Sequence, residues 1–285
     1  MKSCELHIAP SSDYYVYSPS LTAMNTFFYP ICTGHFIYES GYHQHRNSFD
    51  SFLLMYLQSG ELTVNFMDRT EVAVANDFVL LDCYQPHGYQ TSAGCECIWC
   101  HFDGPMARAY YELILSHLGN VFTMHDPYPV YNKLLQIYQT FVPNQPIKEP
   151  LLSKQLTDIL TLLLTYTPLH KNVSNNSNVI EDTVSYITEH FADELTVHEL
   201  ASRAMLSPYH FIRIFKKETG FTPHEYLINT RISTAKYMLK TTRYSIKDIC
   251  FHTGFSCESV FCTSFKKNVG ATPAEYRNRP ANVLS

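Results

Sequence analysis

The sequence of 285 residues has no uninterrupted apolar run of about 18 residues, the length that a membrane-spanning helix requires. Its first residues, MKSCELHIAPSSDYY, also lack the apolar core of a secretory signal peptide. Charged residues make up 16% of the chain and hydrophobic residues 45%, a composition typical of folded globular proteins rather than disordered ones. These absences predict a folded cytoplasmic protein that has no membrane partner and is long enough for two domains.

The sequence also lacks the paired cysteine spacing of a small disulfide scaffold. Its nine cysteines are an odd number, which suits a reducing compartment where a free cysteine packs as a small hydrophobe. Tryptophan occurs only once, as Trp99. A single indole is most simply a core residue, and its combination with other pocket-type residues is what makes it a candidate for binding.

The net charge of −5 is divided unevenly along the chain. From Thr196 onward there are 13 Lys and Arg against 6 Asp and Glu, a net charge of +7, whereas the preceding residues carry 8 against 20, a net charge of −12. A basic segment attracts polyanions such as nucleic acid, although many basic segments are only solvated surface. Any DNA-binding part is therefore expected at the C-terminal side.

The hydrophobic pattern changes along the chain and divides it into parts. Alternating runs such as SFLLMYL, ELTVNFM and DFVLL predict strands over about 21–103, and apolar residues three and four apart predict helices over about 105–167. The polar stretch PLHKNVSNNSN predicts a linker at 168–178. The expected fold is therefore an α+β protein of two domains: a β-sandwich or barrel with a helical pair at 1–167, and an all-α domain at 179–285.

One unit occurs twice in the all-α part. The stretch FKKETGFTPHEY returns 50 residues later as FKKNVGATPAEY. The upstream stretches LTVHELASRAMLS and YSIKDICFHTGFS match at an offset of 49, so the second copy has gained one residue between Ser256 and Phe265. The repeat predicts two equivalent modules, at about 196–220 and 245–270.

Each module contains the start signals of two short helices. Capping boxes, in which an acidic residue follows three positions after Thr or Ser, begin a first helix at Thr196 and at Ser245. After a turn of about three residues, Ser207 is the expected N-cap of the second helix, and Ser256 is its expected counterpart in the second module. Two short helices, a tight turn and a basic second helix predict a helix-turn-helix in each module.

Helical geometry then sorts the residues of the second helices. Phe211 and Phe215 lie four apart and are expected to face the core, as are Phe261 and Phe265 in the second copy. The N-caps and the outward or flanking positions are the candidate DNA-binding residues. They are Ser207, Tyr209, His210, Ile212, Arg213, Lys216 and Lys217 in the first module, and Ser256, Glu258, Ser259, Thr263, Lys266 and Lys267 in the second.

The chemistry of these side chains suits double-stranded DNA. Arginine makes bidentate contacts to guanine, so Arg213 is the candidate base reader, and Tyr209 and His210 can reach base edges or phosphates. The lysines are expected to neutralise phosphates. The segment 223–241, between the modules, predicts a helix of about 28 Å, which would hold the two second helices near the roughly 34 Å that separate successive major grooves.

The last hundred or so residues resemble the DNA-binding domain of the AraC/XylS family of transcription regulators. The stretches that carry the resemblance are LTVHELA, SPYHFIRIFKKETGFTPHEYLINTRISTAKYML and SIKDICFHTGFSCESVFCTSFKKNVGATPAEYR. The resemblance implies base readers at Tyr209, Ile212 and Arg213 in the first module and at Glu258, Ser259 and Thr263 in the second. Family members often have a long polar residue in the place of Ile212 and an arginine in that of Thr263, so the second module is expected to hold phosphates more than it reads bases.

The N-terminal part has a looser similarity to the sugar-sensing regulators of this family, whose N-terminal domain is a cupin-like jelly roll. HRNSFDSFLLMYLQSGEL, DFVLLDCYQPHGY and IWCHFDG carry it, over roughly 42–103. It implies a small-molecule effector, most simply a carbohydrate, held by the guanidinium of Arg46, the phenol of Tyr89 and the indole of Trp99. The family also implies a homodimer formed through the helical pair, and an output, most often activation, through RNA polymerase.

Three histidines admit two interpretations. His43, His45 and His87 are candidate effector contacts, or they are the His-x-His pair and later His of a metal-dependent cupin enzyme. Counted back from Gly60, the position of the carboxylate in such an enzyme falls on Leu53. Asp50 fits only when the motif is counted forward from His45, and the two counts cannot both hold. We therefore predict no metal, no other cofactor and no catalytic residue, and a cupin enzyme with a DNA-binding tail remains the alternative.

A thiol-based redox regulator is a second alternative. Cys95, Cys97 and Cys100 lie close together in the sequence and are followed by His101. Strand alternation sends Cys95 and Cys97 to one face and Cys100 to the other, so tetrahedral zinc binding is not expected. Redox sensing through these thiols remains open at the level of the sequence.

Overall fold

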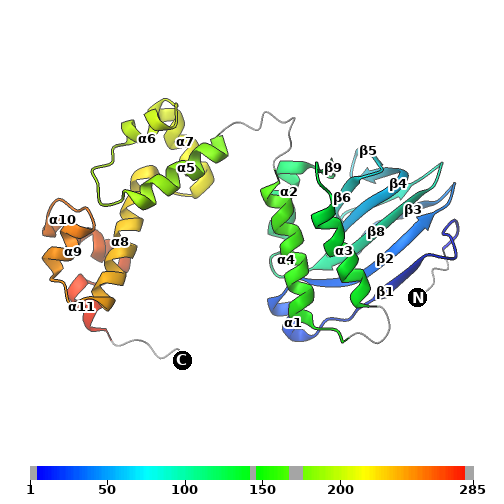
Figure 1. Ribbon diagram of the computed structural model, residues 1–285, viewed down its shortest axis with the longest axis horizontal. Helices are drawn as coiled ribbons and strands as arrows, with labels where there is room; N and C mark the ends of the chain where they lie inside the picture. The colour runs from blue at the N-terminus through cyan, green and yellow to red at the C-terminus, as the bar shows by residue number, and fades with distance from the viewer. Residues whose placement is uncertain (1–4, 142–145, 167–175, 280–285) are drawn as a thin grey trace. The chain divides into compact units, whose positions relative to one another are not determined.

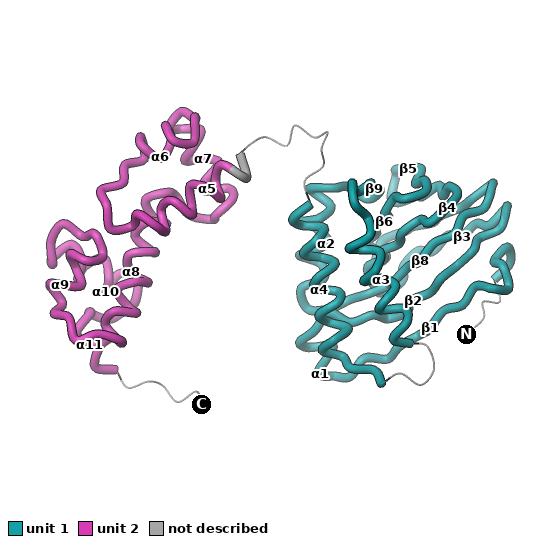
Figure 2. Tube along the Cα trace, viewed as in Figure 1, with its two compact units in different colours: residues 1–171 teal, residues 172–285 magenta. Residues whose placement is uncertain are grey.

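The computed structural model describes residues 5–141, 146–166 and 176–279. The chain divides into two compact units, 1–171 and 172–285 (Figure 2). Most of the segment predicted as a linker, residues 168–175, lies outside the described residues. Its last three residues, 176–178, belong to the first helix of the second unit.

The strands of the N-terminal unit, drawn in Figure 1, form two sheets with a common core between them. They are β1 (Asp13–Val16), β2 (Tyr29–Tyr38), β3 (His43–Arg46), β4 (Phe52–Phe66), β5 (Arg69–Val74), β6 (Asp77–Asp82), β7 (His87–Gln90), β8 (Cys95–Asp103) and β9 (Val121–Thr123). One sheet has the order β1-β2-β8-β4-β6-β9, and the long β4 continues into a second sheet, where it pairs with β5 and β7, and β7 pairs with β3. The prediction of a β-sandwich is confirmed.

The strands do not keep to the predicted range of 21–103. The first strand already begins at Asp13, and Leu21–Thr26 forms helix α1 instead of a strand. The helix begins here because the Ser20 hydroxyl accepts a hydrogen bond from the backbone nitrogen of Ala23 at 3.1 Å. At the other end, β9 lies among the predicted helices, and its three residues are too few to show a strand period.

Three helices cover the outer face of the first sheet (Figure 1). They are α2 (Ala107–Leu118), α3 (Tyr128–Thr140) and α4 (Glu149–Thr165), so the region predicted to hold a helical pair holds three helices. Their apolar stripes pack with Cys100 of β8 in one core, whereas Cys95, Cys97 and Trp99 of the same strand belong to a second core between the sheets. Strand alternation therefore separates the cysteines as predicted. No helix in the described part of the chain is long and apolar enough to cross a membrane.

The described part of the C-terminal unit is helical. Its helices are α5 (Asn176–Glu189), α6 (Val197–Arg203), α7 (Pro208–Thr219), α8 (Pro223–Thr241), α9 (Ile246–His252), α10 (Glu258–Val269) and α11 (Pro273–Asn278). The predicted capping boxes are present, with the hydroxyls of Thr196 and Ser245 accepting from the backbone three residues later. Helices α6–α7 and α9–α10 form the two predicted helix-turn-helix modules, each around its own core.

The additional residue of the second module lies in its turn. Leu206 and Phe255 donate equivalent backbone hydrogen bonds back to the preceding helix, at an offset of 49, but the N-cap positions are Ser207 and Cys257, at an offset of 50. The prediction that Ser256 caps the second helix is therefore wrong, because Ser256 is the inserted turn residue. Cys257 takes the N-cap position and makes no side-chain capping bond.

The loop after α5 packs Phe191 against the core of the first module and also contacts α8 and the turn of the second. Arg231 of α8 donates from Nε to the Phe191 carbonyl at 2.7 Å and from Nη2 to the Asp193 carbonyl at 2.8 Å. Gly254, in the turn of the second module, has a φ of +78°, and a Cβ added there would lie 2.6–2.9 Å from the backbone of Ala192. The two modules are thus held together by close backbone contacts as well as by α8.

Candidate effector pocket and DNA interface

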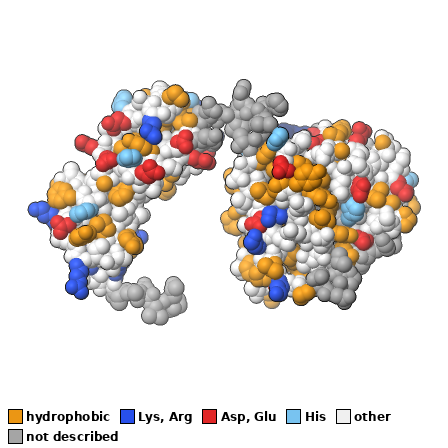
Figure 3. Space-filling model, in the orientation of Figure 1, with side chains coloured by type: hydrophobic (Ala, Val, Ile, Leu, Met, Phe, Trp, Pro, Cys, Tyr) orange, Lys and Arg blue, Asp and Glu red, His pale blue; other side chains and the backbone are white. Residues whose placement is uncertain are grey.

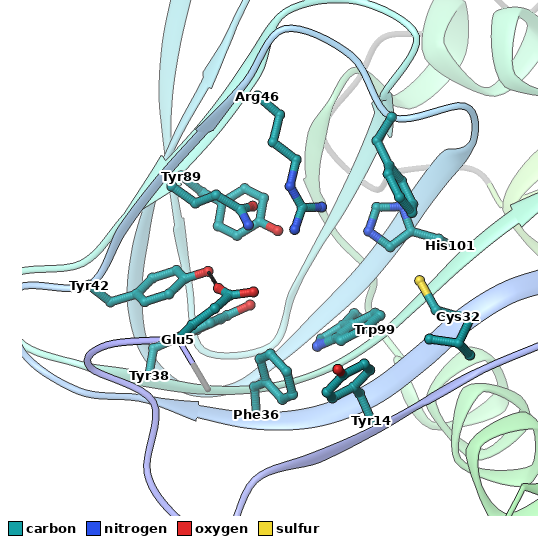
Figure 4. A pocket seen from close by; sticks show the side chains of 13 residues that line it. Glu5, Tyr14, Cys32, Phe36, Tyr38, Tyr42, Arg46, Tyr89, Trp99 and His101 are labelled. Atoms are coloured by element: carbon teal, nitrogen blue, oxygen red, sulfur yellow. Dashed lines mark hydrogen bonds between the residues drawn. The ribbon is translucent and has the colours of Figure 1, made fainter. Parts of the chain in front are cut away.

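A cavity of about 460 Å³ lies between the two sheets (Figure 4). Its Phe, Tyr and Trp lining comes from Tyr14, Phe36, Tyr38, Tyr42, Phe49, Tyr89 and Trp99. Its wall brings together the three residues that the sequence predicts as effector contacts, Arg46, Tyr89 and Trp99. All three are labelled in Figure 4. The cavity has the size and mixed polarity of small-molecule binding sites.

Strand pairing decides which residues of β3 face this cavity. Gln44 lies opposite Tyr89 in the β3–β7 ladder, and Gln44 and Arg46 both line the cavity. Since successive side chains point to opposite faces, His43 and His45 point away from it, and both are exposed. The prediction that these two histidines contact the effector therefore finds no support in this cavity.

Arg46 extends its guanidinium into the cavity (Figure 4). With the Gln44 amide oriented to satisfy its neighbours, the amide oxygen accepts from Nη2 and Nε of Arg46 at 2.6 and 3.1 Å, and the amide nitrogen donates to the Tyr89 hydroxyl at 2.7 Å. The guanidinium carbon lies 5.2 Å from the centre of the Phe49 ring. Within the described residues, Arg46 forms no ion pair with a carboxylate.

Trp99 forms part of the cavity wall from β8. It is 8% exposed, and its Nε1 is buried without a hydrogen-bond partner in the described part of the chain. Gly34 lies opposite it on β2, and a Cβ added there would come within 2.5 Å of the indole carbon Cζ2. Glycine at position 34 therefore makes room for the indole ring. A glycine inside a strand often marks such a close approach, but strand alternation alone does not show which side chain it accommodates.

The cavity also contains residues that the sequence did not indicate. Gln44 could have been found, because it alternates with Arg46 along one strand. Glu5 could not have been found, because it lies before β1 in a segment without periodicity. Its carboxylate lines the cavity and accepts a hydrogen bond from the Tyr42 hydroxyl at 3.0 Å. Tyr14 enters the wall from β1, which precedes the region of predicted strands.

Two buried histidines lie near Arg46. His101 lines the cavity, with its Nδ1 2.8 Å from the Ser51 hydroxyl, whereas His87 is not among the lining residues and its Nδ1 lies 2.9 Å from the Gln85 carbonyl. Burial lowers the pKa of both, that of His101 to about 3 with smaller contributions from Arg46 and His87. Both are therefore uncharged near neutral pH, and the prediction that His87 contacts the effector finds no support in its position.

The described residues contain no group of three or more His, Cys, Asp or Glu side chains arranged to hold a metal ion. His43 and His45 are exposed on the outward side of β3, and His87 is buried on the inward side of β7. A mononuclear cupin centre requires its ligands to converge on one point. The geometry therefore does not favour the alternative of a metal-dependent enzyme.

The thiols of β8 are shielded from solvent. Cys95, Cys97 and Cys100 are buried, and burial raises the pKa of each thiol, that of Cys95 to about 12. Because the thiolate is the reactive form, these cysteines are expected to react slowly with mild oxidants. The geometry does not favour the redox alternative either.

The buried His101 predicts a measurable pH dependence of stability. Its pKa is about 3 in the folded chain against an ordinary 6.5, so below pH 6.5 the unfolded chain takes up a proton that the folded chain does not. This stability is fully present above about pH 6.5 and is lost as the pH falls, with a slope approaching about 1.4 kcal/mol per pH unit. Urea unfolding between pH 7 and 5, followed through the fluorescence of Trp99, measures it.

Replacing His101 with Gln should remove a large part of that slope. His87, whose pKa burial also lowers, accounts for the remainder in the same window. Carboxylates with lowered pKa values, such as Glu149, lose their contribution only at more acidic pH. An unchanged slope in His101→Gln between pH 6.5 and 5 would contradict the assignment.

In the C-terminal unit, the second helices present the predicted outward surface. Tyr209 is 82% exposed, Arg213 and Lys216 are exposed on the same stripe of α7, and Phe211 and Phe215 are fully buried behind them. The flanking positions are either exposed or half-buried: Ser207 and Lys217 are exposed, and His210 and Ile212 are half-buried. In α10 and its N-terminal turn, Ser256, Glu258, Ser259, Thr263, Lys266 and Lys267 are all exposed.

The helical layer of the N-terminal unit also has apolar surface. Figure 3 shows hydrophobic side chains gathered over these helices on the face turned to the viewer. Leu113 of α2, Tyr128 of α3 and Leu151 of α4 are all more than half exposed. Such exposure is consistent with the predicted use of this layer by a second copy.

Comparisons with known proteins agree with this division. The model of the AraC-like ligand binding domain matches residues 33–160, and that of a helix-turn-helix domain matches residues 200–279. The transcriptional activator RhaS of Escherichia coli O157:H7 is 32% identical over 118 residues, which are 41% of this chain and 42% of RhaS. The match thus spans less than half the length of such curated relatives. The chain is therefore similar to AraC-type regulators in both parts, with a ligand binding domain followed by a helix-turn-helix domain.

Several solved structures are similar to all or part of this chain. The DNA-binding domain of AdpA, solved in complex with a target DNA, is 32% identical over 34% of this chain and 88% of that chain, with a TM-score of 0.34. The C-terminal domain of the response regulator AraT from Geobacillus stearothermophilus is 29% identical over 39% of this chain and 94% of that chain, with a TM-score of 0.36. ToxT from Vibrio cholerae is 13% identical over 88% of this chain and 98% of its own, with a TM-score of 0.33.

Proposed function

We propose that this chain is a sequence-specific DNA-binding transcription regulator, and not an enzyme, whose DNA binding is controlled by a small molecule in the N-terminal cavity. The observation that carries the proposal is the combination, in one chain, of an AraC-like ligand binding domain that encloses a lined cavity with two helix-turn-helix modules. Because its target is DNA, we expect it to act in the cytoplasm.

The two modules have unequal roles in this proposal. The stripe on α7 offers the guanidinium of Arg213 and the phenol of Tyr209, both of which can make hydrogen bonds to base edges. The equivalent positions on α10 are Ser259 and Thr263, whose hydroxyls are too short to read a base in the same way. The first module would therefore read sequence, while Lys266 and Lys267 of the second hold phosphates and fix the register.

The proposed effector is of monosaccharide size, and a carbohydrate is the first class to test. Aromatic rings suit the apolar faces of a sugar ring, and Arg46 and Tyr89 supply polar contacts. Since Trp99 is the only tryptophan, its fluorescence reports the cavity without a label. A ligand that changes the affinity for DNA without changing the emission of Trp99 would contradict this location.

The output is proposed to follow the pattern of the relatives. RhaS is named as a transcriptional activator, and activation through contact with RNA polymerase is what we expect of this chain. A homodimer would bring two C-terminal units to paired DNA half-sites, and the exposed apolar side chains of the helical layer are the candidate interface.

Strand β1 is the element that we propose to transmit effector binding to the helices. Tyr14 and Val16 of β1 line the cavity, and the alternate residues face the helical layer. The Tyr138 hydroxyl of α3 donates to the carboxylate of Asp13, and the Tyr17 hydroxyl, just after β1, donates to Glu149 of α4 at 2.9 Å. A ligand that moves Tyr14 would therefore shift the partners of two helices.

Replacing Glu149 with Gln should weaken this transmission while leaving the cavity intact. We expect the effector to bind with nearly the same affinity, but its effect on DNA affinity, typically about 5- to 150-fold in such couplings, to fall at least about threefold. The matched control is Asp158→Asn, since Asp158 also lies on α4 but pairs with Lys133 and Lys154 instead of β1. Equal coupling in both variants would contradict the role of β1.

A further inference from the structure

The cavity of the N-terminal unit contains a guanidinium, that of Arg46, which forms no ion pair within the described part of the chain. Arg46 is held by the Gln44 amide and lies near the Phe49 ring, but no carboxylate of the described residues pairs with it. The carboxylate that lines the cavity, Glu5, accepts a hydrogen bond from Tyr42 and makes no ion pair with Arg46. Figure 4 shows the two charged groups on different sides of the cavity.

The Trp99 indole supplies a second hydrogen-bond donor in this wall. Trp99 is more than nine-tenths buried, and its Nε1 has no partner among the residues that the structure describes. Figure 4 shows the indole nitrogen on the side of the ring turned towards the middle of the cavity, and the guanidinium of Arg46 approaching the same space. A buried donor without an acceptor is costly, so a ligand that supplies an acceptor is favoured.

The other polar groups near Arg46 are uncharged. The imidazole of His101 is neutral near pH 7, and burial raises the pKa of the Tyr89 hydroxyl, so neither neutralises the guanidinium. A neutral sugar hydroxyl would fill this space with a weak dipole. A carboxylate would instead form charge-assisted, potentially bidentate hydrogen bonds in a largely dry site, and these are roughly twice as strong as neutral ones.

We propose that the effector is an anionic, monosaccharide-sized ligand, a uronate or aldonate, whose carboxylate binds Arg46 and approaches Nε1 of Trp99. Its ring or carbon chain lies against the aromatic wall formed by Tyr14, Phe36 and Tyr89, and its hydroxyl groups extend towards Glu5 and Tyr42. This assignment rests on the proposed function for the existence of an effector site, and it narrows the chemical class that the site binds.

The test uses the full chain and four matched pairs of ligands, followed through Trp99 fluorescence. The pairs are glucuronate with glucose, galacturonate with galactose, mannuronate with mannose, and gluconate with sorbitol. We expect an acid to bind at least about 10-fold more tightly than its neutral partner, and Arg46→Gln to abolish that preference. Arg69→Gln is the control, since it removes the same charge from an exposed position on β5. A neutral member that binds as tightly as its acid in every responding pair overturns the proposal.

Quenching of the single tryptophan provides a measurement that does not depend on the choice of ligand. Iodide should quench Trp99 more strongly than caesium does, and Arg46→Gln should reduce quenching by iodide while leaving quenching by neutral acrylamide unchanged. Equal quenching by iodide and caesium, or iodide quenching that Arg46→Gln leaves unchanged, overturns the proposal even if no sugar acid in the panel binds.

These outcomes separate this inference from the proposed function. If neutral sugars bind and change the affinity for DNA, the anionic class is wrong but effector control stands. If acids bind at Arg46 yet leave the affinity for DNA unchanged, the site is correctly assigned but its role in regulation is wrong.

Discussion

Replacing Arg213 with Ala is expected to weaken binding to the preferred DNA site by about 1–3 kcal/mol, roughly 5- to 150-fold, and to relax the preference at one base position. Arg213 is exposed on α7 beside the exposed Tyr209, and no ion pair within the described residues engages it. Its guanidinium is therefore free to make a bidentate contact to guanine. Titration of specific and random DNA by fluorescence anisotropy measures both effects.

Lys266→Ala is the matched comparison on α10, where a phosphate contact is expected instead. Its loss should be about equal on specific and random DNA, and the dependence of affinity on salt should become shallower by about one unit of slope. An equal loss on both DNAs for Arg213→Ala would contradict its assignment as a reader. A loss confined to specific DNA for Lys266→Ala would contradict the assignment of the second module as a phosphate clamp.

Gly254→Ala is expected to destabilise the C-terminal unit by about 2–5 kcal/mol. The left-handed backbone at φ +78° costs a residue with a Cβ about 1–2 kcal/mol, and the contact with Ala192 adds about 1–3 kcal/mol because backbone atoms must move. In the first module the corresponding residue is Met205, at φ 52°, whose side chain is exposed. The requirement for glycine is thus set by packing between the modules as well as by the turn.

Gly220→Ala is the control that isolates the packing contribution. Gly220 has nearly the same φ, +80°, but a Cβ added there meets nothing within 4 Å. Its cost should therefore be only about 1–2 kcal/mol. Thermal or urea unfolding followed by helical circular dichroism compares the two variants. Equal losses of stability would show that the contact with the loop at Ala192 is unimportant.

The sequence predicted the C-terminal unit well because its signals are local. A capping box fixes where a helix starts within four residues, and the spacing of Phe211 and Phe215 fixes which face is buried. The error at Ser256 arose because the two copies match at an offset of 49 before the second helix and of 50 within it. The sequence does not show where the additional residue lies, so either Ser256 or Cys257 could have been the N-cap. Only the backbone hydrogen bond of Phe255 shows that the turn ends one residue later than expected.

The cavity could be predicted only in part because it is assembled from distant segments. The resemblance placed Arg46, Tyr89 and Trp99 in the cavity, and they line it. His43 and His45 do not, because a shift of one residue along a strand moves a side chain to the other face of the sheet. The strand register that decides this depends on pairing with β7, which the sequence does not state.

Selection of the DNA sequences that the full chain binds from a random library tests the central claim most directly. If α8 holds the two second helices about one DNA turn apart, as its length predicts, each half-site should contain two blocks about 10 base pairs apart. The block read by the first module should be the better defined, and it should lose its definition in Arg213→Ala while surviving in Thr263→Ala. Recovery of no enriched sequence, or of a site that Arg213→Ala leaves unchanged, would contradict the account.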